Sequence, residues 1–126
     1  MPKKRLASLD GKDVDQFELI NPLMRKIYTD IQELTKKKQD GVLSKTRIVM
    51  VNRLLENARL LLKEEPSIAY LDRLDEDAIP QNADAMMIIG QYVAALQAFQ
   101  DRHTAGDSFD DKYWITSDGP RQRKVI

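Results

Sequence analysis

Apolar residues recur at spacings of three and four along three long segments of this chain, and this periodicity restricts its fold more than any other feature. The middle segment, residues 44–65, begins with Ser44, which suits a helix cap, and stops before Pro66. Its apolar stripe consists of Ile48, Val51, Leu55, Ala58 and Leu62. Such a stripe covers one face of a helix, so the pattern predicts an amphipathic α-helix.

Two further long helices are expected, one on each side of this segment. Asn21-Pro22 predicts the start of the first, because Asn caps helices and Pro is favoured at the first helical position. Residues 13–20 are expected to form a short turn or helix before it. The last helix is expected to begin at Asn82 or Asp84 and to end near His103. Its apolar residues cover almost its whole circumference, which predicts the central position in a bundle.

These elements predict an all-α fold, a small antiparallel helical bundle. The bundle is expected to span residues 13–106, with three long helices and one short helix at residues 67–74. Residues 1–12 lack apolar periodicity and are expected to form a flexible basic arm. Residues 107–126 are expected to be an irregular aromatic and basic tail.

The charges cancel overall but are sorted along the chain. The sequence has 20 Lys and Arg and 20 Asp and Glu residues. Residues 36–63 carry eight positive and two negative side chains, whereas residues 64–111 carry two positive and eleven negative ones. The basic and acidic blocks are therefore expected either to pair within the fold or to face separate partners.

The sequence lacks the residues and motifs that several classes of protein require. The chain has no cysteine, which excludes disulfides, thiolate metal sites and Cys nucleophiles, and fits a cytoplasmic location. Its longest uncharged stretch, residues 85–100, has 16 residues, fewer than the roughly 20 that a membrane span needs, so no membrane association is expected. No nucleotide, metalloprotease or nucleophile-elbow motif occurs, and His103 is the only histidine. No catalytic residue, metal ligand or cofactor is assigned.

A carboxylate cluster supports a third-ranked hypothesis, a metal-binding protein or a carboxylate enzyme. Mg²⁺ and Ca²⁺ prefer several carboxylate oxygens, and four acidic residues lie close together in the sequence. Their spacing lacks the glycine and the final bidentate Glu of an EF-hand loop. The cluster is Asp72, Asp75, Glu76 and Asp77.

Three basic segments support a second hypothesis, a nucleic-acid-binding accessory protein. Flexible cationic segments bind phosphates without a specific fold, and such binding weakens as salt rises. Against this, the sequence pI is about 6.6, below the value expected of a dedicated nucleic-acid-binding domain. The basic segment from Lys36 to Arg47 also contains no aromatic residues that could stack on bases. The candidate contacts are Lys3, Lys4, Arg5, Lys36, Lys37, Lys38, Lys45, Arg47, Arg121, Arg123 and Lys124.

The favoured hypothesis is a non-enzymatic adaptor or accessory subunit that docks on a partner protein or on a second copy of itself. The last helix has more apolar surface than one bundle face covers, and the second helix has apolar residues outside its main stripe. Small residues spaced by four would admit another backbone closely. The alternative is that the short helix and the aromatic tail cover this surface. The candidate interface residues are Val49, Leu60, Gly90, Ala94, Ala98, Tyr113 and Trp114.

Overall fold

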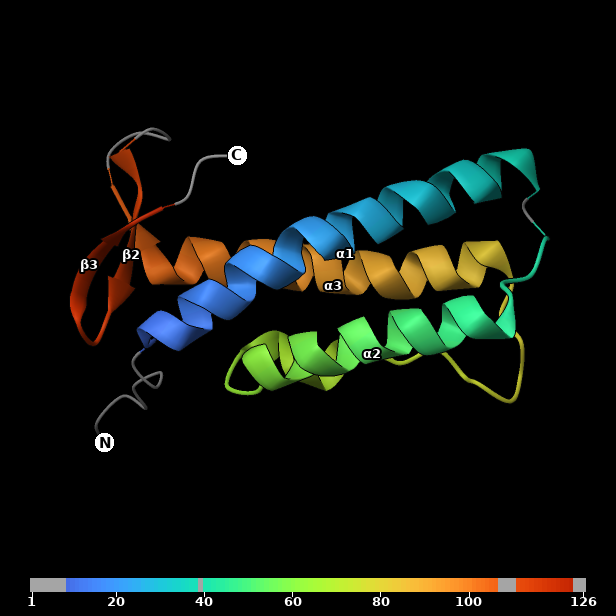
Figure 1. The fold of residues 1–126 in the computed structure, drawn as a ribbon, viewed down its shortest axis with the longest axis horizontal. Helices are drawn as coiled ribbons and strands as arrows, with labels where there is room; N and C mark the ends of the chain where they lie inside the picture. Colours follow the sequence, from blue (N-terminus) through green and yellow to red (C-terminus); the bar gives the residue numbers. More distant parts are fainter. Residues whose placement is uncertain (1–8, 39, 107–110, 124–126) are drawn as a thin grey trace.

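The computed structural model describes residues 9–38, 40–106 and 111–123. Three α-helices form the body of the molecule, α1 (Gly11–Lys37), α2 (Lys45–Leu61) and α3 (Asn82–His103). A 3₁₀ helix, η1 (Pro66–Tyr70), follows α2, and three short strands follow α3. The predominantly helical architecture was predicted, but the strands were not. Figure 1 shows the helices side by side and the strands at one end of the molecule.

α1 begins ten residues before the predicted start at Asn21-Pro22, so that prediction was wrong, and Pro22 lies inside the helix. Asp10 caps the helix: its side chain accepts from the Asp13 N–H at 2.9 Å, and Asp13 in turn accepts from the Asp10 N–H at 3.1 Å. The part of α1 that precedes the predicted start has three buried residues, Val14, Phe17 and Ile20. An interior proline costs about 3 kcal/mol, but each buried apolar side chain contributes about 1.5–3 kcal/mol, so burial outweighs the proline.

α2 follows the predicted bounds closely. Residues 62–81 then run back along the bundle to the end where α2 began, and α3 starts there. Ser44 caps α2 by accepting from the Arg47 N–H at 3.2 Å. The segment preceding α2 lies beside the segment preceding α3, since the Asn82 N–H donates to the Gly41 carbonyl at 2.7 Å. α2 and α3 consequently run in the same direction, and both run opposite to α1 (Figure 1). The bundle therefore contains one parallel helix pair, unlike the simple antiparallel arrangement that was predicted.

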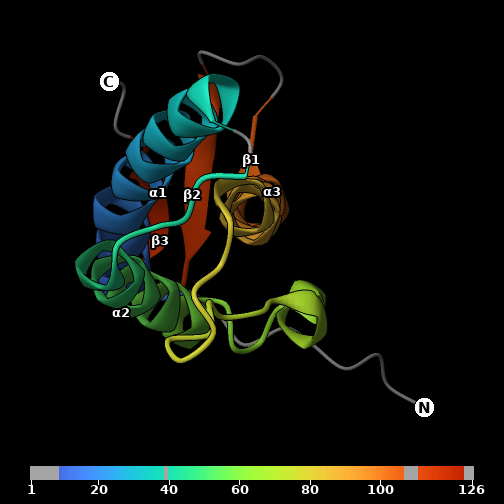
Figure 2. The same cartoon turned by 90° about the vertical axis from the view of Figure 1, so that its right-hand side faces the viewer.

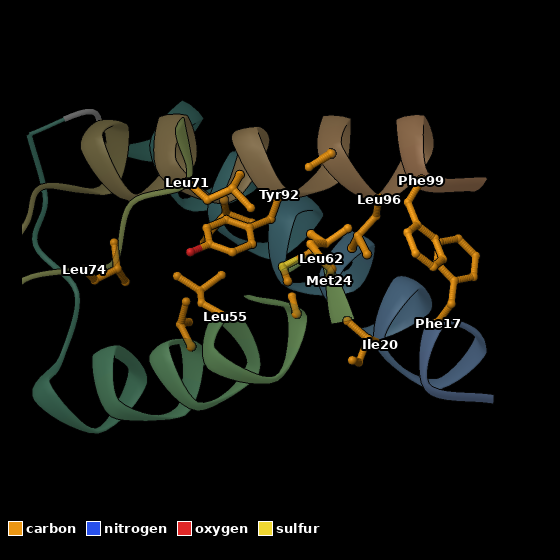
Figure 3. Packing of buried hydrophobic residues seen from close by; sticks show 14 of the residues in the cluster. Phe17, Ile20, Met24, Leu55, Leu62, Leu71, Leu74, Tyr92, Leu96 and Phe99 are labelled. Atoms are coloured by element: carbon orange, nitrogen blue, oxygen red, sulfur yellow. The ribbon is translucent and has the colours of Figure 1, made fainter. Parts of the chain in front are cut away.

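The core lies between the three helices, and α3 contributes to it along its whole length. Tyr92, Ile89 and Leu96 of α3 are fully buried. Figure 3 shows Tyr92 beside Leu71 at one part of the core and the rings of Phe99 and Phe17 at another. The central position predicted for this helix is consistent with the packing of α3 against α1, α2, η1 and the strands.

The tail that was predicted to be irregular contributes two strands to a small antiparallel sheet, and the residues just before it contribute the third. The strands are β1 (Thr104–Ala105), β2 (Tyr113–Thr116) and β3 (Gly119–Gln122), in the order β1-β2-β3. Gly106 follows β1 with a φ of +140°, and a Cβ there would lie 2.7 Å from the Asp111 carbonyl oxygen, so only glycine fits. The aromatic character of the tail was recognised in the sequence, but four-residue strands are too short to produce a clear alternation.

The sheet packs on the helical core through one side chain and is tied to the beginning of α1. Trp114 of β2 is fully buried, with its ring centroid 5.0 Å from that of Phe17 and 6.1 Å from that of Phe99. The Ser117 N–H donates to the Leu9 carbonyl at 2.8 Å. Leu9 is buried and Gly11 begins α1, so these residues of the predicted 1–12 arm are part of the fold, and residues 1–8 lie outside the described residues.

Candidate docking groove between α1 and α2

The C-terminal half of α1 diverges from α2 and leaves a groove between the two helices. In Figure 1 this half of α1 rises away from α2, and Figure 2, viewed toward the same end, shows the ends of the two helices apart with α3 beside them. The groove has a cavity volume of about 400 Å³. Its lining residues are Ile27, Asp30, Ile31, Glu33, Leu34, Lys37, Arg47, Met50 and Val51. It is named the α1–α2 groove below.

The floor of the α1–α2 groove is apolar. Ile27, Ile31 and Leu34 of α1 face Met50 and Val51 of α2 across it. Ile31 and Val51 also belong to the buried core, whereas the Met50 side chain is 52% exposed. The groove is thus an opening of the hydrophobic core to solvent, with a large and flexible side chain on one wall.

Two exposed leucines extend this apolar surface along α1. Leu19 and Leu23 precede Ile27 at four-residue spacing, so the three side chains form one ridge along the helix. Leu23 is 55% exposed and Leu19 is 62% exposed. Such a continuous exposed apolar ridge beside an apolar groove is typical of an interaction surface.

The rim of the groove is charged, and its acidic members are already paired. Asp30 accepts from Lys26 Nζ at 2.8 Å, and Glu33 from Lys36 Nζ at 3.3 Å. In contrast, neither Lys37 nor Arg47 has an ion-pair partner among the described residues. The unpaired charge at the groove is therefore positive.

The predicted interface residues of α2 and α3 differ in their surroundings. Val49 and Leu60 are exposed on α2 but do not line the α1–α2 groove. On α3, Gly90 is used within the chain: a Cβ there would lie 3.4 Å from the Tyr28 ring of α1. Ala94 and Ala98 are exposed. The small-residue strip thus partly serves the contact between α1 and α3.

The two aromatic residues predicted for the interface differ in their positions. Trp114 belongs to the buried core, whereas the neighbouring Tyr113 is 38% exposed. Successive strand residues point to opposite faces, which explains the difference. Of the two alternatives expected for the tail, Trp114 follows the one in which the tail packs against the helices.

The predicted nucleic-acid contacts lie at opposite ends of the molecule. The basic residues around the α1–α2 connection form one group at one end: Lys36, Lys37, Lys38, Lys45 and Arg47. Arg121 lies at the other end on β3, where it donates to the Gly11 carbonyl at 2.9 Å and pairs with Asp15. Arg123 also has interactions within the chain. Lys3, Lys4, Arg5 and Lys124 lie outside the described residues.

The acidic residues between η1 and α3 have separate partners. Asp72 accepts from Gln91 Nε2 at 3.1 Å, and Glu76 accepts from Asn52 Nδ2 at 3.3 Å. Asp75 accepts from the backbone N–H groups of Ala78 and Asp77, and these bonds lower the pKa of its carboxyl group. No three His, Asp or Glu side chains among the described residues are arranged to hold a metal ion.

His103 serves a structural ion-pair cluster at the end of α3. Its Nε2 lies 3.1 Å from Glu65 Oε2, and Arg102 Nε lies 3.3 Å from Glu65 Oε1. Glu65 is only 5% exposed, so these two partners compensate for the loss of water around its carboxylate. The cluster connects the end of α3 to the segment between α2 and η1.

The groove residues on α1 were overlooked because the sequence marks them as core. Ile27, Ile31 and Leu34 recur at spacings of four and three in the first predicted helix, and this periodicity reports only that such residues share a face. Whether a second helix covers that face depends on the angle between helices, for which the chain carries no local signal. Met50 also lies outside the predicted α2 stripe, but it was not among the candidate interface residues.

Comparison of the chain with protein-family models, with curated proteins and with solved structures found no match. None of the helices in the described parts of the chain is long and apolar enough to cross a membrane.

Proposed function

We propose that this protein is a non-enzymatic adaptor or accessory subunit that binds an amphipathic helix of a partner protein in the α1–α2 groove. The observation that supports this most strongly is the open apolar groove between two helices of the bundle. A partner helix placed there would bury the surface that a fourth helix covers in a four-helix bundle.

The length of the groove fits a helical ligand. Its α1 wall runs from Ile27 to Lys37, and ten residues of helix correspond to about 15 Å, or nearly three turns. Helix-in-groove recognition uses apolar side chains at positions i, i+3 or i+4, and i+7, which span about 10 Å. The groove therefore accommodates three successive anchors of one helix face.

The chemistry of the groove favours apolar side chains over a polar small molecule. Small-molecule sites combine apolar walls with a few polar groups that converge on the ligand. Here the polar residues of the lining, Asp30, Glu33, Lys37 and Arg47, are exposed, and the floor is aliphatic. Apolar burial without specific polar contacts matches the face of an amphipathic helix.

A peptide-binding experiment with two matched variants tests the proposal. The probe is a fluorescein-labelled, lactam-stapled helical peptide with leucines at alternating spacings of four and three and glutamines elsewhere. Its binding to the wild type, Met50→Glu and Leu60→Glu is measured by fluorescence anisotropy. Met50 is 52% exposed and Leu60 is 62% exposed on the same helix, but only Met50 lines the groove.

We expect Met50→Glu to weaken binding about tenfold or more, because a carboxylate facing an apolar contact costs well over 1.4 kcal/mol. Leu60→Glu should leave binding unchanged, and circular dichroism should show both variants folded. Equal binding by all three proteins would overturn the proposal. It would also be overturned if wild type but not Met50→Glu formed a dimer in sedimentation, since a second copy would then occupy the groove.

A further inference from the structure

We infer that the helix bound in the α1–α2 groove is acidic, with its carboxylates placed against Lys37 and Arg47; this inference rests on the function proposed above. The groove fixes where a partner lies, and the charges on its rim select which amphipathic helices bind. The inference therefore concerns the chemical class of the partner.

The first argument is the unpaired positive charge at one end of the groove. Lys26 and Lys36 neutralise Asp30 and Glu33, so these four charges on α1 cancel in pairs. Lys37 lies in the last turn of α1 and Arg47 in the first turn of α2, and both line the groove. An occupant of the groove therefore meets two cations that have no carboxylate partner within the described residues, and electrostatic complementarity favours an acidic occupant.

The second argument is the unusual charge at the N-terminus of α2. The N-terminal end of a helix carries partial positive charge and favours acidic residues. α1 and α3 follow this rule with Asp13 and Asp84, but α2 has no acidic residue in its first turn and begins with Lys45-Thr46-Arg47. Residue choices that conflict with local stability are typically found at functional sites. Carboxylates of a partner would offset the repulsion between these basic side chains and the positive end of the α2 dipole.

The structure also separates this basic end from Arg121, a predicted nucleic-acid contact of the tail. Arg121 is bound to the beginning of α1 by Gly11 and Asp15 at the opposite end of the molecule. The predicted nucleic-acid contacts among the described residues therefore do not form one continuous basic surface for a phosphate backbone. Lys37 and Arg47 border the aliphatic floor of the groove. An acidic amphipathic helix would contact both the cations and the aliphatic floor, whereas a nucleic acid would contact the cations alone.

A charge-exchange experiment tests this inference. Three labelled, lactam-stapled peptides share the same leucine face and carry glutamine, glutamate or lysine at four positions of the opposite face. Their affinities for the wild type and for the double variant Lys37→Glu with Arg47→Glu are measured by fluorescence anisotropy at low and high salt. The control variant is Arg53→Glu, which changes an exposed cation of α2 that does not line the groove.

We expect the wild type to bind the glutamate peptide about tenfold more tightly than the lysine peptide, because the glutamates form ion pairs with Lys37 and Arg47 whereas the lysines are repelled by them. The double variant should reverse this order, and Arg53→Glu should preserve it. The preference should shrink as salt rises.

Two results would overturn the inference. One is that the double variant keeps the wild-type order of the three peptides. The other is that a 20-nucleotide single-stranded DNA binds the wild type more tightly than the glutamate peptide at the same salt. If the glutamine peptide still binds and Met50→Glu still weakens that binding about tenfold or more, the proposed function survives and only the acidic character of the partner is wrong.

Discussion

Tyr92 joins α3 to the returning chain after η1, through a hydroxyl group buried in the core. The hydroxyl donates to the Asp72 carbonyl at 2.6 Å, and the side chain is fully buried. Burial raises the pKa of Tyr92, and the nearby Arg59 partly opposes this effect. A phenol whose pKa is higher in the folded state than in the unfolded state makes the fold sensitive to alkaline pH.

We predict that Tyr92→Phe destabilises the protein at neutral pH but weakens its alkaline sensitivity. The lost hydrogen bond costs about 1 kcal/mol. In the wild type, the contribution of Tyr92 is fully present below the unfolded pKa of about 10 and is lost as pH rises through the raised folded pKa, because the unfolded phenol ionises first. Urea unfolding between pH 7 and pH 11 should therefore show a shallower alkaline loss of stability in the variant.

Tyr70→Phe provides the matched control, since Tyr70 is 78% exposed. Its free energy of unfolding at neutral pH should stay within about 0.5 kcal/mol of the wild type. If Tyr92→Phe has the same alkaline slope as the wild type, Tyr92 does not link folding to ionisation.

Among elements, the sheet at the end of the chain is the one that the sequence predicted least well. β2 and β3 pair over four residues, with Trp114 opposite Arg121 and Ile115 opposite Pro120. Trp114 packs against the aromatic rings of two helices, so the sheet is anchored by tertiary contact rather than by its own length. Short strands of this kind depend on burial against other elements, which a local pattern does not report.

We predict that Trp114→Ala costs about 3–5 kcal/mol of unfolding free energy, because it removes a fully buried aromatic ring. Ile115→Ala, at the adjacent and 52% exposed position, should cost less than about 1 kcal/mol. Unfolding in urea should be followed by circular dichroism, because Trp114 is the only tryptophan and its loss removes the fluorescence signal. Similar costs for the two variants would show that the sheet is not anchored through Trp114.

The helices show where sequence reasoning succeeds and where it does not. α2 and α3 were predicted almost to their ends, because Ser44 and Pro66 bound one and apolar periodicity marks both. The start of α1 was misplaced because Pro22 resembles a first helical residue, and the signal was read without the burial of Val14 and Phe17 before it. Proline rules describe local cost, and tertiary packing overrides them here.

At the scale of the whole molecule, the structure shows where the basic and acidic segments of the sequence lie and which of their charges are paired. Both arginines of the acidic segment form ion pairs: Arg102 pairs with Glu65 of the same segment, and Arg73 pairs with Glu56 of the basic segment. The basic residues at the α1–α2 connection lie at the end of the molecule where α3 begins (Figure 1). They include Lys37 and Arg47, which line the groove and have no ion-pair partner among the described residues. The charge blocks were visible in the sequence, but their relation to an apolar groove depends on the divergence of α1 from α2.

The candidate site itself was predictable only in part. Lys37 and Arg47 were singled out as basic residues, although for nucleic acid, whereas Ile27 and Leu34 were not among the candidate site residues. Val49 and Leu60, which were selected for lying outside the apolar stripe, are exposed but do not line the groove. Residue type and periodicity identify exposed apolar positions, whereas a groove is a property of the space between two helices.

The most direct test of the docking account is methyl NMR of the labelled wild-type protein titrated with the glutamate peptide. We predict chemical-shift changes at the methyl groups of Ile27, Ile31, Leu34 and Met50, which line the groove. The methyl groups of Leu60 and Ile115, which are exposed elsewhere, should not shift. Saturable binding with shifts centred on Leu60 or Ile115, and none in the groove, would contradict the account.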